Sequence, residues 1–185
     1  MCIIKVETVV GGNRPFLARF IASKLCRARE GRFFMDKRGY VGIGIEDAKF
    51  VANIGTLWRS AMCLGADFIF TIANRYSKDP TNTTQSQRHV PYFHYKTIKD
   101  FQEHLPLGAK IVGVELLNEA LPLETFHHPQ QAIYILGGED RTLSRELQEI
   151  CDFKVKFTSE YCLNVSVAGS VVLYDRHQKA GLDSR

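Results

Sequence analysis

Short apolar runs alternate along the chain with longer segments in which apolar residues recur every three or four positions. Five runs have the length of buried strands: residues 40–45, 66–72, 110–116, 132–136 and 153–157. Helical spacing marks four further segments, which are residues 47–65, residues 98–105, and the stretches that begin at residues 142 and 165. Because strands and helices alternate with short links, the pattern predicts an α/β fold with a mostly parallel sheet sandwiched by helices.

The composition is typical of a globular protein with one domain. Of the 185 residues, 45% are hydrophobic and 24% are charged, and no apolar run approaches the roughly 18 to 20 residues of a membrane span. The five cysteines are odd in number and include no C-x-x-C pair, which argues against a disulfide framework or a zinc site. We therefore expect a cytoplasmic protein with no bound metal and no membrane-spanning helix.

The net charge of +4 is concentrated in the N-terminal part. Residues 1–39 carry nine Lys and Arg against three Asp and Glu, and no acidic residue occurs between Glu7 and Glu30. Apolar residues at helical spacing in this stretch predict a basic amphipathic helix. It could be an RNA-binding extension, a packing helix or an organelle transit peptide, and the sequence leaves these open. We expect a basic N-terminal extension at 1–39 and a single domain at 40–185.

Residues 75–95 are polar and long for an ordinary connection. Cations, among them Arg75, Lys78 and Arg88, alternate there with aromatic residues. Such a segment could grip phosphates and stack on unpaired bases. The alternative is a solvated loop whose aromatic side chains pack into the body, and the sequence does not decide between the two.

A ligand site is predicted where the run at 132–136 ends. Gly137 and Gly138 follow it, and a missing Cβ lets backbone approach a ligand at the carboxyl end of a strand. Further on, Asn164 is suited to cap a helix that carries small residues at 168–170 for close packing. Two such transitions close in sequence can form one pocket.

Residues 132–147 and 161–174 resemble two of the three signature motifs of the SpoU/TrmH branch of the SPOUT methyltransferases. Residues 53–61 (NIGTLWRSA) are similar to the first motif, and the three span about two thirds of the chain in the expected order. The resemblance implies an S-adenosyl-L-methionine-dependent enzyme that methylates a ribose 2′-hydroxyl of tRNA or rRNA. It also implies a homodimer and a C-terminal trefoil knot, a feature that general fold rules would not suggest.

The resemblance also implies which residues contact the cofactor. They follow the strands at 110–116, 132–136 and 153–157 or belong to the third motif: Val114, Glu115, Leu136, Gly137, Gly138, Phe157, Cys162 and Leu163. Ordinary core packing is the competing explanation for the apolar members, above all for Val114 and Phe157.

Four residues carry the catalytic expectation from the family motifs. Arg59 stays protonated, so we expect it to clamp an RNA phosphate and polarise the hydroxyl rather than accept a proton. Asn53 would orient the RNA or Arg59. Glu139 would anchor the pocket, either through backbone donors at a helix start or by holding Arg59. Asn164 has a structural reason as a helix cap beside its catalytic one.

Cys162 departs from the motif, since many relatives have Ser at that position. A backbone contact to the cofactor would survive the change, whereas a step that needs a hydroxyl would not. The alternative to an enzyme is a non-catalytic RNA-binding protein of the same fold. We expect RNA as the partner, and neither DNA nor a membrane.

Overall fold

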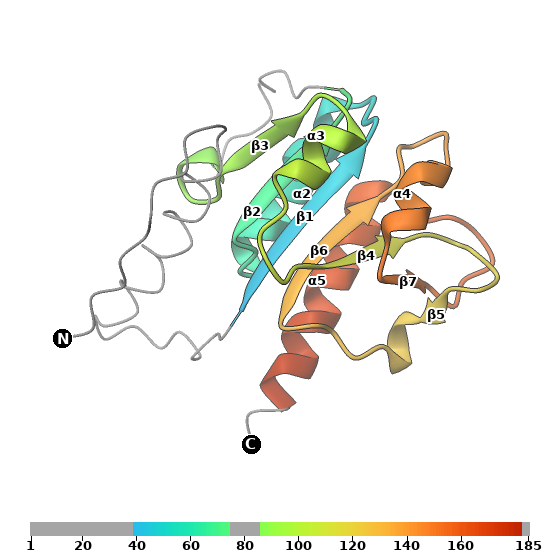
Figure 1. Ribbon diagram of the computed structural model, residues 1–185. Helices are drawn as coiled ribbons and strands as arrows, with labels where there is room; N and C mark the ends of the chain where they lie inside the picture. Colours follow the sequence, from blue (N-terminus) through green and yellow to red (C-terminus); the bar gives the residue numbers. More distant parts are fainter. Residues whose placement is uncertain (1–38, 75–85, 183–185) are drawn as a thin grey trace, which may run out of the picture. The chain divides into compact units, whose positions relative to one another are not determined.

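The computed structural model describes residues 39–74 and 86–182. Its described part contains one sheet of seven strands, in the order β3-β2-β1-β6-β4-β7-β5. The strands are β1 (Tyr40–Glu46), β2 (Phe68–Ile72), β3 (Tyr92–Tyr95), β4 (Lys110–Val114), β5 (Leu121–Pro122), β6 (Gln131–Leu136) and β7 (Phe153–Lys156). All neighbouring strands pair in parallel (Figure 1). The predicted α/β fold with a parallel sheet is confirmed, and the trefoil knot stays a prediction.

Helices cover both faces of the sheet. The helices α2 (Val51–Cys63) and α5 (Val165–Leu182) lie on one face, and α3 (Ile98–Glu103) and α4 (Arg145–Ile150) lie on the other (Figure 1). Two short 3-10 helices are η1 (Ser86–Arg88) and η2 (Leu123–Thr125). Parallel sheets need this cover because their strands are apolar on both sides, which explains the continuous apolar runs in the sequence.

Small residues let α5 approach α2 and the sheet closely. A Cβ on Gly169 would lie 2.5 Å from Leu57 Cδ1 and 3.3 Å from Ile43 Cδ1, so a larger residue there would require the Leu57 side chain to move. The Ser170 hydroxyl donates to the Ser60 hydroxyl at 2.6 Å. The close packing predicted for residues 168–170 is confirmed.

The segment at 75–95 was wrongly predicted to be a loop throughout. Its end forms β3, an edge strand that pairs with β2. The Thr71 hydroxyl lies 2.6 Å from the Tyr92 hydroxyl, and the Trp58 and Tyr92 rings are 5.4 Å apart. Partners distant in sequence therefore stabilise a strand whose own residues give only a weak apolar pattern. Arg75 and Lys78 lie outside the described residues, as do residues 1–38 of the N-terminal extension.

Smaller differences concern where elements begin. The helix predicted from residue 47 begins at Val51. The helix predicted from residue 142 begins at Arg145, because the Ser144 side chain caps it by accepting from the Leu147 N–H. In the described part, no helix is long and apolar enough to cross a membrane. The same residues contain no cluster of three or more metal-binding side chains.

Candidate functional site

A pocket of about 480 Å³ lies where β4, β6 and β7 end and α5 begins. The parallel register brings these carboxyl ends together, since Val114 of β4 pairs with Leu136 of β6 and with Val155 of β7. Ligand sites of open α/β sheets form at such ends. The pocket is lined by Val114, Glu115, Leu116, Leu136, Gly137, Gly138, Glu139, Asp140, Arg141, Thr142, Phe157, Ser159, Cys162, Leu163, Asn164, Val165 and Ala168.

The structure brings together most of the residues singled out in the sequence. All eight residues expected to contact a cofactor line the pocket, and so do Glu139 and Asn164. Asp140 also lines the pocket, within the stretch 137–140 where the sequence predicted a ligand, whereas Arg141 and Thr142 of the same loop and Ser159 after β7 were missed. Their positions directly after the ends of strands were the signal that could have found them.

Two carboxylates hold the loop that forms one wall of the pocket. Glu115 Oε2 accepts from the Leu143 N–H at 2.9 Å, and Glu46 Oε2 accepts from the Ser144 N–H at 2.8 Å. Glu115 Oε1 also accepts from the Leu116 N–H at 3.0 Å. Glu115 therefore shapes the wall by binding backbone donors from two segments.

The glycines after β6 are needed by the protein's own backbone. A Cβ on Gly137 would lie 2.8 Å from the Arg141 carbonyl oxygen, and one on Gly138 would lie 2.9 Å from that of Asp47. These separations are too short for real side chains. The loop can thus fold back on itself and against the connection between β1 and α2. These glycines were expected to permit the approach of a ligand, whereas the atoms that exclude a Cβ belong to the chain's own backbone.

A polar centre at the pocket mouth joins all three motifs, and we define it as Asn53, Glu139 and Asn164. Asn53 Nδ2 donates to Glu139 Oε1 at 2.8 Å, and Asn164 Nδ2 donates to Asn53 Oδ1 at 3.1 Å. Glu139 also accepts from the backbone N–H groups of Lys49 at 3.0 Å and Phe50 at 3.3 Å. The centre therefore ties the start of α2 and the start of α5 to the loop after β6.

Glu139 was expected either to bind backbone donors at a helix start or to hold Arg59. The structure shows the first: its carboxylate accepts from backbone N–H groups at the start of a helix. The helix is α2, which begins 88 positions earlier in the chain, at Val51, and not the helix that follows Glu139. The Phe50 side chain makes no cap for α2, and Glu139 instead binds the backbone N–H groups of Phe50 and of Lys49, directly before the helix. An anion at this position also suits the positive end of the helix dipole.

Glu139 is an ionised acceptor at neutral pH. Burial alone would raise the pKa of its carboxyl, but hydrogen bonds from Asn53 and from the Lys49 and Phe50 N–H groups outweigh burial and lower the pKa. A carboxylate with these partners is poorly suited to take up a proton from a substrate. Its chemistry here is positional, because it holds Asn53 in a fixed orientation.

Asn164 is the predicted helix cap, and this part of its expected role is confirmed. Asn164 Oδ1 accepts from the Ser166 N–H at 3.0 Å and from the Ser166 hydroxyl at 2.6 Å. The Nδ2 of the same side chain donates to Asn53 Oδ1. One side chain therefore both starts α5 and completes the polar centre.

Arg59 does not line the pocket of its own chain. It is an exposed residue of α2, six residues after Asn53, which corresponds to about 9 Å along the helix axis. Arg88 is exposed on η1, and the Trp58 Nε1–H donates to the Val90 carbonyl at 2.9 Å, which ties the segment after η1 to α2. The two arginines thus lie on neighbouring elements, and neither lines the pocket.

The charges that line the pocket favour a cation. Glu115, Glu139 and Asp140 face a single cationic lining residue, Arg141. Arg141 Nη1 lies 3.6 Å from Asp47 Oδ2, so part of its charge is already compensated. A ligand that brings positive charge therefore meets a complementary surface.

Residues 41–174 match the model of the SpoU rRNA Methylase family. This chain belongs to that family. The match spans all three motifs and every element that lines the pocket, so the sequence resemblance is confirmed.

Individual members agree with this placement. A protein of Staphylococcus haemolyticus, whose name assigns it provisionally to the TrmH family of tRNA/rRNA methyltransferases, is 30% identical over an alignment 148 residues long, which covers 74% of this chain and 56% of that protein. This SpoU-family chain thus spans about half the length of the curated relatives it matches.

Solved structures of the family share the fold. The SpoU methyltransferase AviRb from Streptomyces viridochromogenes superposes with a TM-score of 0.70 at 22% identity, over 79% of this chain and 61% of AviRb. Its complex with the cofactor AdoMet gives 0.66 at 20% identity, over 76% of this chain and 58% of that one. A structure that concerns 2-OH methylation of C/U34 on tRNA gives 0.68 at 21% identity, over 80% of this chain and 99% of that one.

Proposed function

We propose that this chain is an S-adenosyl-L-methionine-dependent RNA methyltransferase that acts on a ribose 2′-hydroxyl of tRNA or rRNA as a homodimer. The observation that carries the proposal is the polar centre, in which residues from all three family motifs meet at the mouth of one pocket. The AdoMet complex of AviRb and the structure that concerns 2-OH methylation of tRNA support the choice of cofactor and acceptor.

The pocket suits the proposed cofactor in size and charge. A volume of about 480 Å³ falls within the roughly 300 to 1,000 Å³ of small-molecule sites. Leu136, Phe157 and Leu163 offer apolar contacts, and the loop at Gly137 and Gly138 offers backbone groups. When bound, S-adenosylmethionine supplies an electrophilic methyl group on a positively charged sulfur, and the acidic lining is complementary to that charge.

The chain's own residues would position the acceptor rather than activate it by strong acid–base chemistry. Glu139 is held ionised by its donors and keeps Asn53 oriented toward the pocket mouth. Arg59 stays protonated, and it would bind a phosphate and polarise the hydroxyl next to it. Orientation of this kind can supply much of a rate enhancement without a specialised base.

A homodimer would give Arg59 access to a pocket. On α5, Val167, Val171 and Tyr174 are 46%, 38% and 56% exposed at helical spacing, which leaves an apolar strip without cover in one chain. In our proposal, a second copy covers this strip and brings Arg59 of one chain beside the pocket of the other. The further RNA contacts are assigned to Arg88 and, outside the described residues, to Arg75, Lys78 and the extension at 1–39.

The experiment is methyl transfer to bulk tRNA and rRNA by Arg59→Ala, with Arg145→Ala as the matched control. Arg145 is an exposed arginine of α4, a helix on the opposite face of the sheet, and it pairs with Glu149 of its own helix. Arg59→Ala should lower transfer by about 100-fold or more through lost positioning, with unchanged S-adenosylmethionine affinity. Arg59→Lys then tests whether a point charge suffices or the bidentate fork is required.

Mixing two inactive variants tests the dimer. Arg59→Ala combined with the pocket variant Leu163→Trp, a change at a pocket-lining residue that is 43% exposed, should regain part of the activity, because a mixed dimer would hold one intact arginine beside one intact pocket. Full activity of Arg59→Ala alone would reject the assigned role. RNA binding by the wild type without methyl transfer would instead support the non-catalytic RNA-binding alternative.

A further inference from the structure

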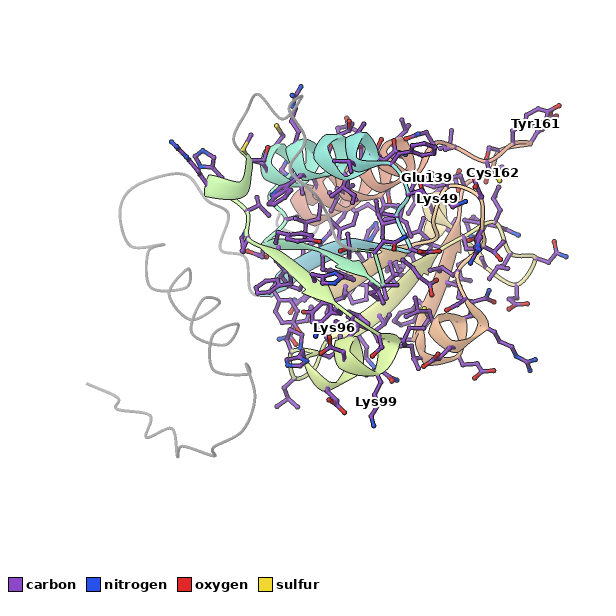
Figure 2. The ribbon with its side chains drawn as sticks, turned by 90° about the horizontal axis from the view of Figure 1, so that it is seen from above. Lys49, Lys96, Lys99, Glu139, Tyr161 and Cys162 are labelled. Atoms are coloured by element: carbon purple, nitrogen blue, oxygen red, sulfur yellow. The ribbon has the colours of Figure 1, made fainter. Side chains whose placement is uncertain are left out.

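Two aromatic side chains are exposed beside the polar centre. Tyr161 is 81% exposed and Phe50 is 59% exposed. Each stands three residues before an asparagine of the centre, Phe50 before Asn53 and Tyr161 before Asn164. In Figure 2, Tyr161 extends away from the body beyond Cys162, whereas Lys49, the neighbour of Phe50, lies beside Glu139. The two rings therefore belong to the segments that border the pocket mouth.

The backbone at each ring makes a hydrogen bond. The Phe50 N–H donates to Glu139 Oε1 of a distant loop at 3.3 Å. The hydroxyl of Ser159, a pocket-lining residue, donates to the Tyr161 carbonyl within the same loop at 3.0 Å. The rings gain little from burial within this chain, because most of their surface faces solvent. They therefore present flat apolar surfaces to solvent next to the site.

The charges at the mouth do not favour a phosphate. The Lys49 ammonium pairs with the Asp140 carboxylate, and Arg141 pairs with Asp47 at 3.6 Å. The Glu139 carboxylate adds a further negative charge. A polyanion would therefore find its cationic contacts elsewhere on the chain, and the mouth itself offers aromatic faces.

Aromatic faces recognise nucleobases that are not stacked in a helix. In a duplex both faces of each base are covered by its neighbours, whereas an unpaired base can lie on Phe or Tyr. Stacking of this kind requires no charge on the protein. It is thus the mode of RNA binding that fits the mouth as it is built.

We propose that Tyr161 and Phe50 are stacking platforms for unpaired nucleobases next to the methylated nucleotide, so that this enzyme selects its target within a single-stranded segment. The inference rests on the proposed function, because it names the form of RNA that the same site accepts. Neither ring is a catalytic residue. Their contribution is to substrate affinity and choice.

The test compares the binding of two labelled RNAs to the full chain by fluorescence anisotropy, a single-stranded oligonucleotide and a blunt duplex that contains the same strand. Tyr161→Ala and Phe50→Ala should each weaken binding of the single strand by about 5- to 150-fold, as expected for one lost stacked base. Tyr161→Phe and Phe50→Tyr should keep near wild-type affinity, because a ring is retained. Duplex binding should not change.

Salt dependence distinguishes stacking from charge. The slope of log affinity against log salt reports the number of neutralised phosphates, so both alanine variants should keep the wild-type slope while losing affinity. Leu107→Ala is the control, since Leu107 is 99% exposed and precedes β4, at the opposite end of the strands from the pocket. It should behave as wild type with both RNAs.

Several outcomes would overturn the inference while leaving the proposed function standing. These are equal losses on single strand and duplex, a reduced salt slope, or unchanged single-strand affinity in an enzyme that still transfers methyl groups. Sedimentation that shows dissociated Tyr161→Ala would assign that ring to a subunit interface instead. Weaker S-adenosylmethionine binding with intact RNA binding would assign it to the cofactor. A wild-type chain that neither binds RNA nor transfers methyl groups would reject both proposals.

Discussion

Polar networks tie α5 to the rest of the molecule in two places, and they differ in their exposure. At its start, Asn164 joins the polar centre, which lies at the mouth of a pocket. Further along α5, Asp175 reaches the buried side chain of His128, which lies 2.6 Å from the hydroxyl of the fully buried Tyr134. The first network faces solvent and a ligand-sized space, whereas the second, here called the enclosed network, is centred on the buried side chains of His128 and Tyr134, with Asp175 and Lys179 partly exposed at its edge.

The enclosed network is saturated with protein partners. His128 Nε2 lies 2.8 Å from Asp175 Oδ2, and the Lys179 ammonium lies 2.7 Å from the same oxygen. Arg176 Nη1 donates to the Tyr134 hydroxyl at 3.2 Å. Among the described residues, no buried side-chain nitrogen or oxygen lacks a partner. This cluster has the side-chain types of a proton relay, but no substrate can reach a fully buried tyrosine, so its role is structural.

The comparison shows that side-chain chemistry alone does not identify a site. Both networks contain a carboxylate that is hydrogen-bonded to a residue distant in sequence. Glu139 accepts from Asn53, and Asp175 contacts His128. What distinguishes them is access, since only the polar centre borders an open space with bonding capacity left for a ligand. Substitutions should therefore affect stability at one network and activity at the other.

The largest expected effect is on stability, from His128→Ala. The variant removes one hydrogen-bond partner each from the Tyr134 hydroxyl and the Asp175 carboxylate, which keep Arg176 and Lys179. It also leaves a void in place of the imidazole, and together these losses should lower the free energy of unfolding by about 2 to 4 kcal/mol. Urea unfolding measures this loss. The folded fraction should bind S-adenosylmethionine with wild-type affinity, and weaker binding would contradict the separation of the two networks.

Glu139→Gln should have the reverse pattern. The amide keeps the side chain's shape but loses the charge and one acceptor, so the start of α2 is held less well, at a cost of about 1 kcal/mol. A displaced Asn53 should lower methyl transfer by up to about 100-fold through lost positioning. Steady-state kinetics and urea unfolding on the same sample compare the two effects. A stability loss as large as that of His128→Ala, with normal kinetics, would make Glu139 a structural residue only.

A pH titration of stability sharpens the comparison without any substitution at the site. Burial is the largest influence on His128 and lowers its pKa below 6.5, against the opposing effect of Asp175. Below about pH 6.5 the unfolded chain therefore binds more protons than the folded chain. The free energy of unfolding falls as the pH is lowered, by at most about 1.4 kcal/mol per pH unit for one proton. Glu139 has a pKa lowered from 4.5, so the stability it contributes is lost only at more acidic pH.

The control for this titration is His128→Gln, which should flatten the stability profile between about pH 6.5 and 5, where only the histidines among the side chains ordinarily titrate. Urea midpoints at several pH values measure it. A profile as steep in His128→Gln as in the wild type would assign the slope to other groups.

The smallest expected effect is that of Cys162→Ser, within about 2-fold in kcat/KM, since many family members have Ser there and a backbone contact to the cofactor would be kept. Cys63→Ser is the matched control, because Cys63 is also exposed but belongs to α2 outside the pocket lining. A large loss of turnover in Cys162→Ser alone would show that the thiol takes part.

Local pattern in the sequence was enough for the five buried strands, because buried strands of a parallel sheet are continuous apolar runs. It also placed a ligand site at Gly137 and Gly138, which directly follow one of these strands. Val114 and Phe157 were assigned to the same site only by resemblance to the family, and the structure places them in the pocket lining. The edge strand β3 was missed because its stability comes from Thr71 and Trp58, which are distant in sequence.

Tertiary structure decided which partners the site residues have. That Glu139 holds the N–H groups before α2, and that Gly138 packs against Asp47, depends on how two loops about 90 residues apart meet. The exposure of Tyr161 and the burial of His128 are likewise set by neighbours from other elements. Periodicity reports only the local chain, whereas hydrogen bonds between loops and access to solvent arise from the folded whole, so only the structure could separate a ligand site from a buried clamp of similar chemistry.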